Sequence, residues 1–168
     1  MYLAEKDMYP DVTRWWRNYL ISYYRRSEVI VSNTSRTVLW KFLQDKGLSS
    51  YFKDYLSYEI QVDITGIIKT QKRVFLTFVE CKLKPISLRD ISQLLGYSVV
   101  ARPLYSLIVS PRGISKSVNY LLTTFNRYDI LKYGDNRSIR VANWNSQRKE
   151  IDLTTLIPSG PFVIMSAL

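Results

Sequence analysis

The segment 73–83, RVFLTFVECKL, is the feature that most constrains the fold. Its apolar residues run almost without a break, which is typical of a central strand that is covered on both faces. The segment before it, 59–68, alternates polar and apolar residues with the period of a β-strand. Residues 70–72 can form the turn between the two. We therefore expect a β-hairpin inside a layered domain, with helices packed on the sheet.

The rest of the chain alternates between helical and strand patterns. Helical spacing of apolar residues, together with capping residues, predicts helices over 10–25, from residue 33, 34 or 35 to 46, over 88–100 and over 115–128. In the helix 88–100 the expected apolar stripe is Leu88, Ile91, Leu95 and Val99. Short apolar runs predict strands at 28–32, 105–110, 130–133 and 138–144. Without an internal repeat or a linker, residues 1–168 are expected to form a single α/β domain around a mixed sheet.

Composition removes several classes of chemistry. The chain has no histidine and one cysteine, Cys81. Catalytic triads that need an imidazole, histidine-containing metal sites, disulfide frameworks and four-cysteine zinc sites are therefore excluded. Any catalysis must depend on carboxylates, lysine, hydroxyls or a hard metal ion held by oxygen. Cys81 itself is expected to be a small buried residue.

The charge balance favours a polyanionic partner. There are 24 Lys and Arg residues against 14 Asp and Glu residues, a net charge of +10. A basic domain of this size favours nucleic acid, and the alternative is an ordinary basic surface. Within 14–53 only two acidic residues oppose eight basic ones. The expected contacts to nucleic acid are Arg14, Arg17, Arg25 and Arg26 in this stretch, and Lys84 and Arg89 further along, for which ordinary solvation is the alternative.

No segment of the sequence predicts a membrane or a targeting role. The first eleven residues are charged and lack an apolar core, and no apolar run approaches the roughly 18 residues that a membrane span requires. A lone thiol suits a reducing compartment. We expect a cytoplasmic protein with no membrane partner.

Three charged residues interrupt the apolar hairpin. Asp63 lies within the first predicted strand, and Glu80 and Lys82 lie two apart at the end of the second, on one face. An unpaired buried charge costs several kcal/mol, so these groups either neutralise one another as a structural ion pair or surround a divalent cation. Two converging carboxylates suit Mg²⁺ or Mn²⁺. A lysine beside such a site can position or deprotonate a water and stabilise a phosphoryl transition state.

Asp63, followed after sixteen residues by Glu80-Cys81-Lys82, resembles the signature of the PD-(D/E)XK nuclease superfamily. The resemblance covers 58–111 and, loosely, the N-terminal helix. In size and element order the chain is most similar to archaeal Holliday-junction resolvases and related small archaeal or viral nucleases. The proline that names the signature is replaced by Val62. The resemblance implies a restriction-endonuclease-like α/β sandwich, with a central mixed sheet flanked by helices.

The same resemblance implies roles for further residues. The backbone carbonyl of Cys81 would join Asp63 and Glu80 around the metal ion. Gln93, on the following helix, would assist positioning, and Glu5 would be a further acidic residue of the site.

We therefore expect a metal-dependent DNA endonuclease that acts on duplex or branched DNA. It would require Mg²⁺ or Mn²⁺ and no small-molecule cofactor. A homodimer is expected because two strands must be cut by one small site per chain. The alternatives are a catalytically inert nucleic-acid-binding protein of the same fold, and a ribonuclease.

Overall fold

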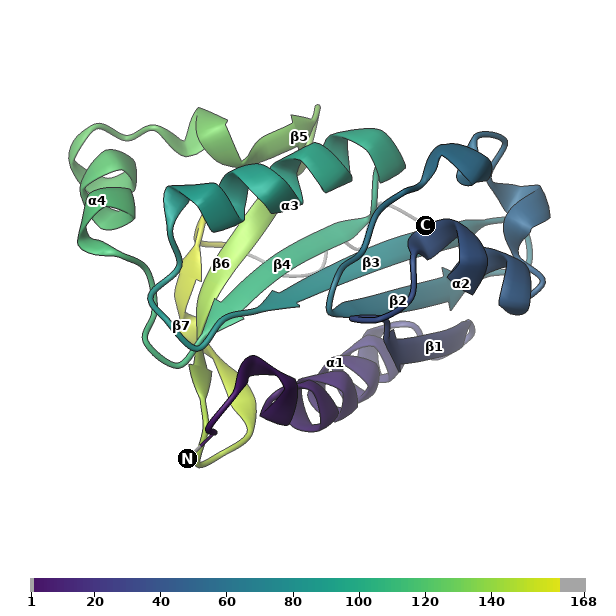
Figure 1. Cartoon of the computed structure of the whole chain (residues 1–168), viewed down its shortest axis with the longest axis horizontal. Helices are drawn as coiled ribbons and strands as arrows, with labels where there is room; N and C mark the ends of the chain where they lie inside the picture. The colour runs from purple at the N-terminus through teal and green to yellow at the C-terminus, as the bar shows by residue number, and fades with distance from the viewer. Residues whose placement is uncertain (1, 161–168) are drawn as a thin grey trace.

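The computed structural model describes residues 2–160, which form a seven-stranded mixed sheet with helices on both faces (Figure 1). Its strands are β1 (Glu28–Asn33), β2 (Ile64–Lys69), β3 (Val74–Cys81), β4 (Tyr105–Ser110), β5 (Lys132–Gly134), β6 (Arg137–Asn145) and β7 (Glu150–Ile157). The order across the sheet is β1-β2-β3-β4-β6-β5, and β7 also pairs with β6. β3, β4 and β6 run parallel, while the remaining pairs are antiparallel. The expectation of an α/β domain around a mixed sheet is confirmed.

Within residues 2–160, four α-helices connect and cover the strands. They are α1 (Tyr9–Tyr23), α2 (Leu39–Asp45), α3 (Leu88–Ala101) and α4 (Lys116–Asn119), which continues into a π-helical turn over 120–124. Short 3₁₀ turns lie at Glu5–Asp7, Ser49–Tyr51, Tyr55–Ser57 and Tyr128–Leu131. Within 2–160, no helix has the length and apolar character needed to span a bilayer.

One face of the sheet is covered by α1. Val12, Trp16 and Leu20 of this helix are fully buried in a cluster that also includes Val79 of β3. The indole N–H of Trp16 donates a hydrogen bond to the Thr77 hydroxyl across 2.9 Å. This contact requires a close approach between helix and sheet, which predicts that side-chain volume is restricted there.

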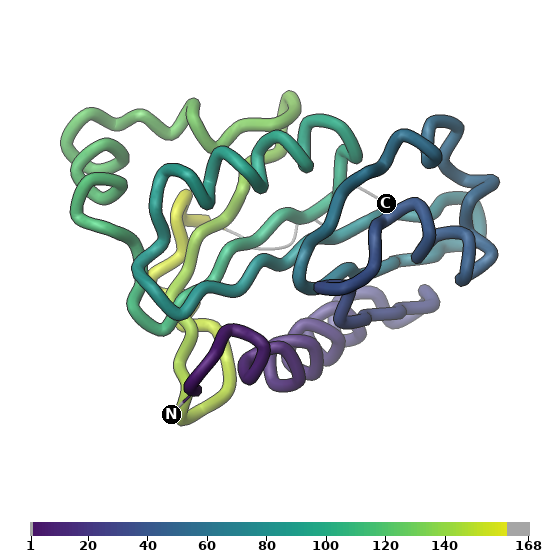
Figure 2. Tube along the Cα trace, viewed as in Figure 1, coloured from purple at the N-terminus to yellow at the C-terminus, as the bar shows by residue number. Residues whose placement is uncertain are grey.

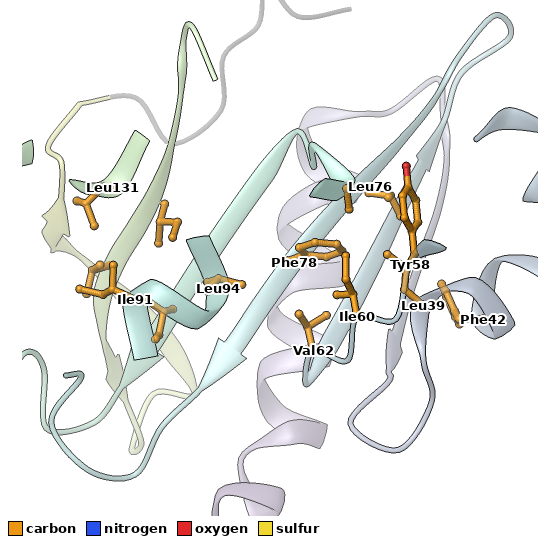
Figure 3. Packing of buried hydrophobic residues seen from close by; sticks show 14 of the residues in the cluster. Leu39, Phe42, Tyr58, Ile60, Val62, Leu76, Phe78, Ile91, Leu94 and Leu131 are labelled. Carbon is orange, nitrogen blue, oxygen red and sulfur yellow. The ribbon is translucent and has the colours of Figure 1, made fainter. Parts of the chain in front are cut away.

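The opposite face carries a second cluster, in which the irregular segment 58–62 and α2 pack over β3, while α3 packs over β4 and β6 (Figure 3). The buried side chains labelled there are Leu39, Phe42, Tyr58, Ile60, Val62, Leu76, Phe78, Ile91, Leu94 and Leu131. β3 is therefore covered on both sides, as its apolar run predicts.

Several local expectations are wrong. The predicted strand 59–68 begins only at Ile64, and Asp63 precedes it rather than lying inside it. The alternation over 59–63 arises because Ile60 and Val62 pack under α2 while the residues between them face outward. The predicted helix from about 33 to 46 is shorter, because the backbone of 34–37 forms a turn in which the amide of Thr37 bonds the carbonyl of Thr34.

The buried stripe of α3 also differs from the expectation. Ile91, Leu94, Ser98 and Ala101 are buried, whereas Leu88 and Val99 are about half exposed. The hydroxyl of Ser98 is hydrogen bonded to that of Ser106 on β4, which satisfies a polar group inside the core.

The C-terminal half departs from the prediction in two further ways. The helix predicted over 115–128 is present only to Thr124, as the short α4 and the π-helical turn that continues it. β7 was not predicted, since its solvent-facing residues weaken the strand pattern.

The parallel strands bring distant parts of the chain to one edge. β3, β4 and β6 end at Cys81, Ser110 and Asn145, so their carboxyl ends meet at this edge of the sheet. The N-terminal segment passes beside the turn between β6 and β7 (Figure 2). It is held there by the indole N–H of Trp144, which donates to the Tyr2 hydroxyl across 3.2 Å.

The contact between α1 and the sheet can be tested at Gly66 of β2. A Cβ atom at this position would overlap the Thr77 hydroxyl and touch the Trp16 indole nitrogen. We expect Gly66→Ala to lower the free energy of unfolding by about 1–3 kcal/mol, as overpacked cores do. The matched control is Gly96→Ala on α3, where a Cβ meets no atom within 4 Å. That control should raise stability by up to about 1 kcal/mol. Urea unfolding measures both, and equal effects of the two substitutions would contradict the close packing of Trp16 and Thr77 at Gly66.

Candidate active site

Asp63 and Glu80 lie side by side at the end of the β2–β3 hairpin. The antiparallel pairing of Ile64 with Val79 sets this juxtaposition, because Asp63 and Glu80 are the next residues on each side. The Asp63 carboxylate accepts a hydrogen bond from the backbone N–H of Cys81 across 2.8 Å. The backbone N–H of Asp63 in turn donates to the Glu80 carboxylate across 3.4 Å. The two carboxylates are thus held against each other by reciprocal bonds.

Lys82 completes the pair that the sequence places on one face. Its ammonium nitrogen lies 2.9 Å from Oε1 of Glu80. Glu80 is 8 % exposed, and Lys82 is partly buried. Cys81, between them, points to the opposite face and packs in the cluster under α1, as expected.

Glu5 joins these residues from the 3₁₀ turn before α1. One of its oxygens lies 3.9 Å from the Lys82 ammonium, and the other accepts the backbone N–H of Leu83 across 3.4 Å. The structure therefore brings together four of the expected residues. A lysine lies among three carboxylates, which carry more negative charge than it can neutralise.

Tyr9 is a member of this group that the sequence did not predict. It lies in the first turn of α1, four residues after Glu5, and is 9 % exposed. Burial, and then the nearby Asp63 carboxylate, raise the pKa of its phenol. The one signal in the sequence is the four-residue spacing between Glu5 and Tyr9, which is typical of two side chains on the same face of a helix.

Burial and mutual repulsion shape the charges of the site. Burial, and then the neighbouring Asp63 carboxylate, raise the pKa of Glu80 to about 7, although Lys82 opposes this shift. Burial alone would lower the pKa of Lys82, but the carboxylates of Glu80, Glu5 and Asp63 outweigh it and raise that pKa. The lysine is therefore a firmly protonated cation in this arrangement, and Glu80 titrates near neutral pH.

The other expected residues lie apart from this cluster. Gln93 is exposed on α3 and donates a hydrogen bond to the Tyr97 hydroxyl across 3.4 Å, with no bond to the four residues. Exposed positions are taken by Lys84 after β3, Arg89 in the first turn of α3, Arg14 and Arg17 on α1, and Arg25 and Arg26 after α1. At 1.5 Å per residue, the end of α1 lies about 20 Å from its start, so Arg25 and Arg26 are far from the site.

The donor set fits a hard divalent cation. No group of three or more His, Cys, Asp or Glu side chains in residues 2–160 is arranged to enclose a metal ion. Mg²⁺, however, is usually held by one or two carboxylates, with waters and substrate phosphate oxygens completing its shell. Asp63 and Glu80 supply those two carboxylates, and the Cys81 carbonyl that the sequence resemblance adds belongs to the same stretch of backbone.

Comparison with protein families, with curated proteins and with solved structures gives no match for this chain.

The raised pKa of Glu80 predicts how stability depends on pH in the presence of a chelator. Its folded-state pKa, about 7, exceeds its ordinary value of 4.5, so the folded protein binds more protons between these values. The contribution of Glu80 to the free energy of unfolding therefore falls as pH rises from about 5 to 7. We expect wild-type protein to lose stability relative to Glu80→Gln over this range, as measured by urea unfolding.

Glu59→Gln is the control for this comparison, because Glu59 is exposed on the segment before β2. Its stability difference from wild type should not vary with pH over the same range. A difference between wild type and Glu80→Gln that is also constant would show that Glu80 titrates normally.

Proposed function

We propose that this protein is a metal-dependent nuclease that hydrolyses phosphodiester bonds, with DNA as the first substrate to test. The observation that carries the proposal is the pairing of two carboxylates, Asp63 and Glu80, beside Lys82 at the carboxyl end of β3. This arrangement accords with the resemblance of the sequence to the PD-(D/E)XK superfamily. The net charge of +10 supports a polyanionic substrate.

A purely structural ion pair between Glu80 and Lys82 accounts for less of the geometry than a metal site does. The Lys82 ammonium nitrogen lies 2.9 Å from Oε1 of Glu80, and a stabilising ion pair would need no further charged residue. Yet Glu5 also approaches Lys82, and Asp63 enters no ion pair among the described residues. Because three carboxylates around one lysine leave an excess of negative charge, a cation is the partner that would offset their repulsion.

In the proposed reaction each residue has a task that its contacts define. Asp63 and Glu80 would hold the metal ion, and the Cys81 N–H orients the Asp63 carboxylate, which also has the buried Tyr9 phenol as a neighbour. When bound, Mg²⁺ would supply Lewis-acid activation of a water and would neutralise phosphate charge. Lys82, kept protonated by its neighbours, would orient the attacking water and stabilise the charge that develops on the phosphate. Glu5 holds the ammonium of Lys82 from the other side.

Cleavage of labelled substrates by purified protein tests this proposal. The panel contains supercoiled plasmid, linear duplex, single strand, a four-way junction and RNA of the same sequence, each with Mg²⁺, Mn²⁺ or chelator. We expect metal-dependent cutting, and we expect Asp63→Asn and Lys82→Ala to reduce its rate at least about 100-fold, since positioned acid–base and metal groups contribute that much. Mg²⁺ should also raise the melting temperature of wild type but not of Asp63→Asn.

Matched controls come from the same chain. Asp135 lies in the exposed turn between β5 and β6, and Lys72 lies in the turn at the other end of the β2–β3 hairpin. The control variants are Asp135→Asn and Lys72→Ala. Both should cut like wild type. Cutting that persists in chelator or in both site variants would overturn the assignment of the site. Metal-independent binding without cutting of any substrate would favour an inert binding protein, and cutting of RNA alone would make the enzyme a ribonuclease.

A further inference from the structure

A cleft of about 680 Å³ opens beside the candidate site at the carboxyl ends of the parallel strands. It is lined by Tyr2, Leu83, Lys84, Pro111, Arg112, Ser146 and Gln147. These residues come from the N-terminal segment and from the loops after β3, β4 and β6. Ligands of open α/β sheets bind at this kind of edge, outside the carboxyl ends of strands. The cleft adjoins the site through Leu83, which follows Lys82 and donates its backbone N–H to Glu5.

The cleft combines apolar walls with unpaired positive charge. Tyr2, Leu83 and Pro111 supply apolar surface, while Lys84 and Arg112 are exposed cations. Among the described residues 2–160, no carboxylate lines the cleft and neither cation enters an ion pair. Two other basic residues differ, because Arg14 on α1 and Lys149 in the turn between β6 and β7 both pair with Asp11, at 3.8 and 3.2 Å. A phosphate at Lys84 or Arg112 therefore competes with no carboxylate, whereas a phosphate at Arg14 or Lys149 would compete with Asp11.

The two loops that carry the cations are fixed to each other. The buried hydroxyl of Ser110 donates to the carbonyl of Lys84 across 2.9 Å and accepts the backbone N–H of Arg112 across 3.0 Å. Ile86 and Ile114 form a parallel β-bridge that joins the same loops further along. The spacing of the backbones that bear Lys84 and Arg112 is thus set before any ligand arrives, which lowers the ordering cost of binding.

We propose that this cleft binds a single-stranded nucleotide segment next to the phosphate that is cut. The proposal rests on the function proposed above for Asp63, Glu80 and Lys82. Unpaired bases and sugars would contact the apolar walls, and Lys84 and Arg112 would hold the flanking phosphates, as in other single-strand sites. A volume of about 680 Å³ suits a ligand of a few nucleotides at most. An intact duplex keeps its bases stacked inside and could not offer them to these walls, so frayed, flapped or single-stranded DNA is the preferred substrate.

Binding in the presence of chelator tests the cleft without requiring catalysis. The probes are fluorescently labelled single-stranded DNA of ten nucleotides, the same strand as RNA, a blunt duplex of the same sequence and a duplex with a splayed end. Wild type should bind the single strand and the splayed duplex about tenfold or more tightly than the blunt duplex. The double variant Lys84→Gln/Arg112→Gln should lose that preference and bind the single strand about tenfold more weakly. Its affinity should also depend less on salt, by about 1.4 in the logarithmic slope for two lost phosphate contacts.

The matched control is Lys72→Gln/Arg73→Gln, which removes the same charge at the opposite end of the hairpin, where both residues are exposed. It should bind single-stranded DNA like wild type. An equal loss in both double variants would overturn the proposal, because it would reveal a response to net charge alone. Wild-type protein that binds neither open probe, or prefers the blunt duplex, would overturn it as well. A preference for the RNA strand would keep the cleft and change the polymer.

Failure of this inference is distinguishable from failure of the proposed function. If Mg²⁺-dependent cutting occurs and the cleft variant binds like wild type, the nuclease stands and the cleft is not its substrate site. If single strands bind through Lys84 and Arg112 but nothing is cut, the cleft stands and the catalytic proposal fails.

Discussion

The buried carboxylate of Glu80 is the group on which the arrangement of the site depends. It lies on a strand whose neighbouring residues are apolar, where an uncompensated charge would cost several kcal/mol. Lys82 and the backbone N–H of Asp63 each offset part of this cost, at 2.9 and 3.4 Å. The compensation is incomplete, because burial and the neighbouring Asp63 carboxylate still raise the pKa of Glu80. The nearby Asp63 carboxylate adds electrostatic repulsion to the cost of burying Glu80. An apolar residue at position 80 would avoid both costs, so stability alone does not account for a carboxylate there.

The excess negative charge also explains why the N-terminal turn matters. Glu5 approaches Lys82, and Tyr9 contacts Asp63, so the start of α1 holds both sides of the hairpin end. Residues 5 and 83 are 78 positions apart in sequence, and their contact forms only when α1 is docked on the sheet. Closing such a long loop is costly in entropy. The site is therefore a product of the complete fold and not of the hairpin that carries its signature.

The sequence predicted the parts that depend on local patterns. The apolar run of β3 was sufficient to identify a covered central strand, and its interruption by Glu80 and Lys82 identified the polar face. Asp63 was correctly placed opposite them, yet for an incorrect reason, because the alternation over 59–63 reflects packing under α2 and not a strand. Tyr9 and the cleft beside Leu83 could not be predicted, since both arise from contacts between elements that are distant in sequence. The periodicity of apolar residues indicates local secondary structure and carries no information about such contacts.

Parallel pairing gives the cleft its form. β3, β4 and β6 lie side by side, about 4.8 Å apart, so the loops that follow them leave the sheet as neighbours. Ser110 ties the first two loops together, and the bond between Trp144 and Tyr2 brings the N-terminal segment against the third. The carboxylates of Asp63 and Glu80 and the cations of the cleft consequently lie at one edge of the sheet. A strand that enters the cleft would be drawn by the cations toward carboxylates that repel it, unless a divalent ion lies between them. The cleft would thus hold the strand without a metal ion, whereas metal binding would be the condition for bringing the phosphate up to Asp63 and Glu80 for chemistry.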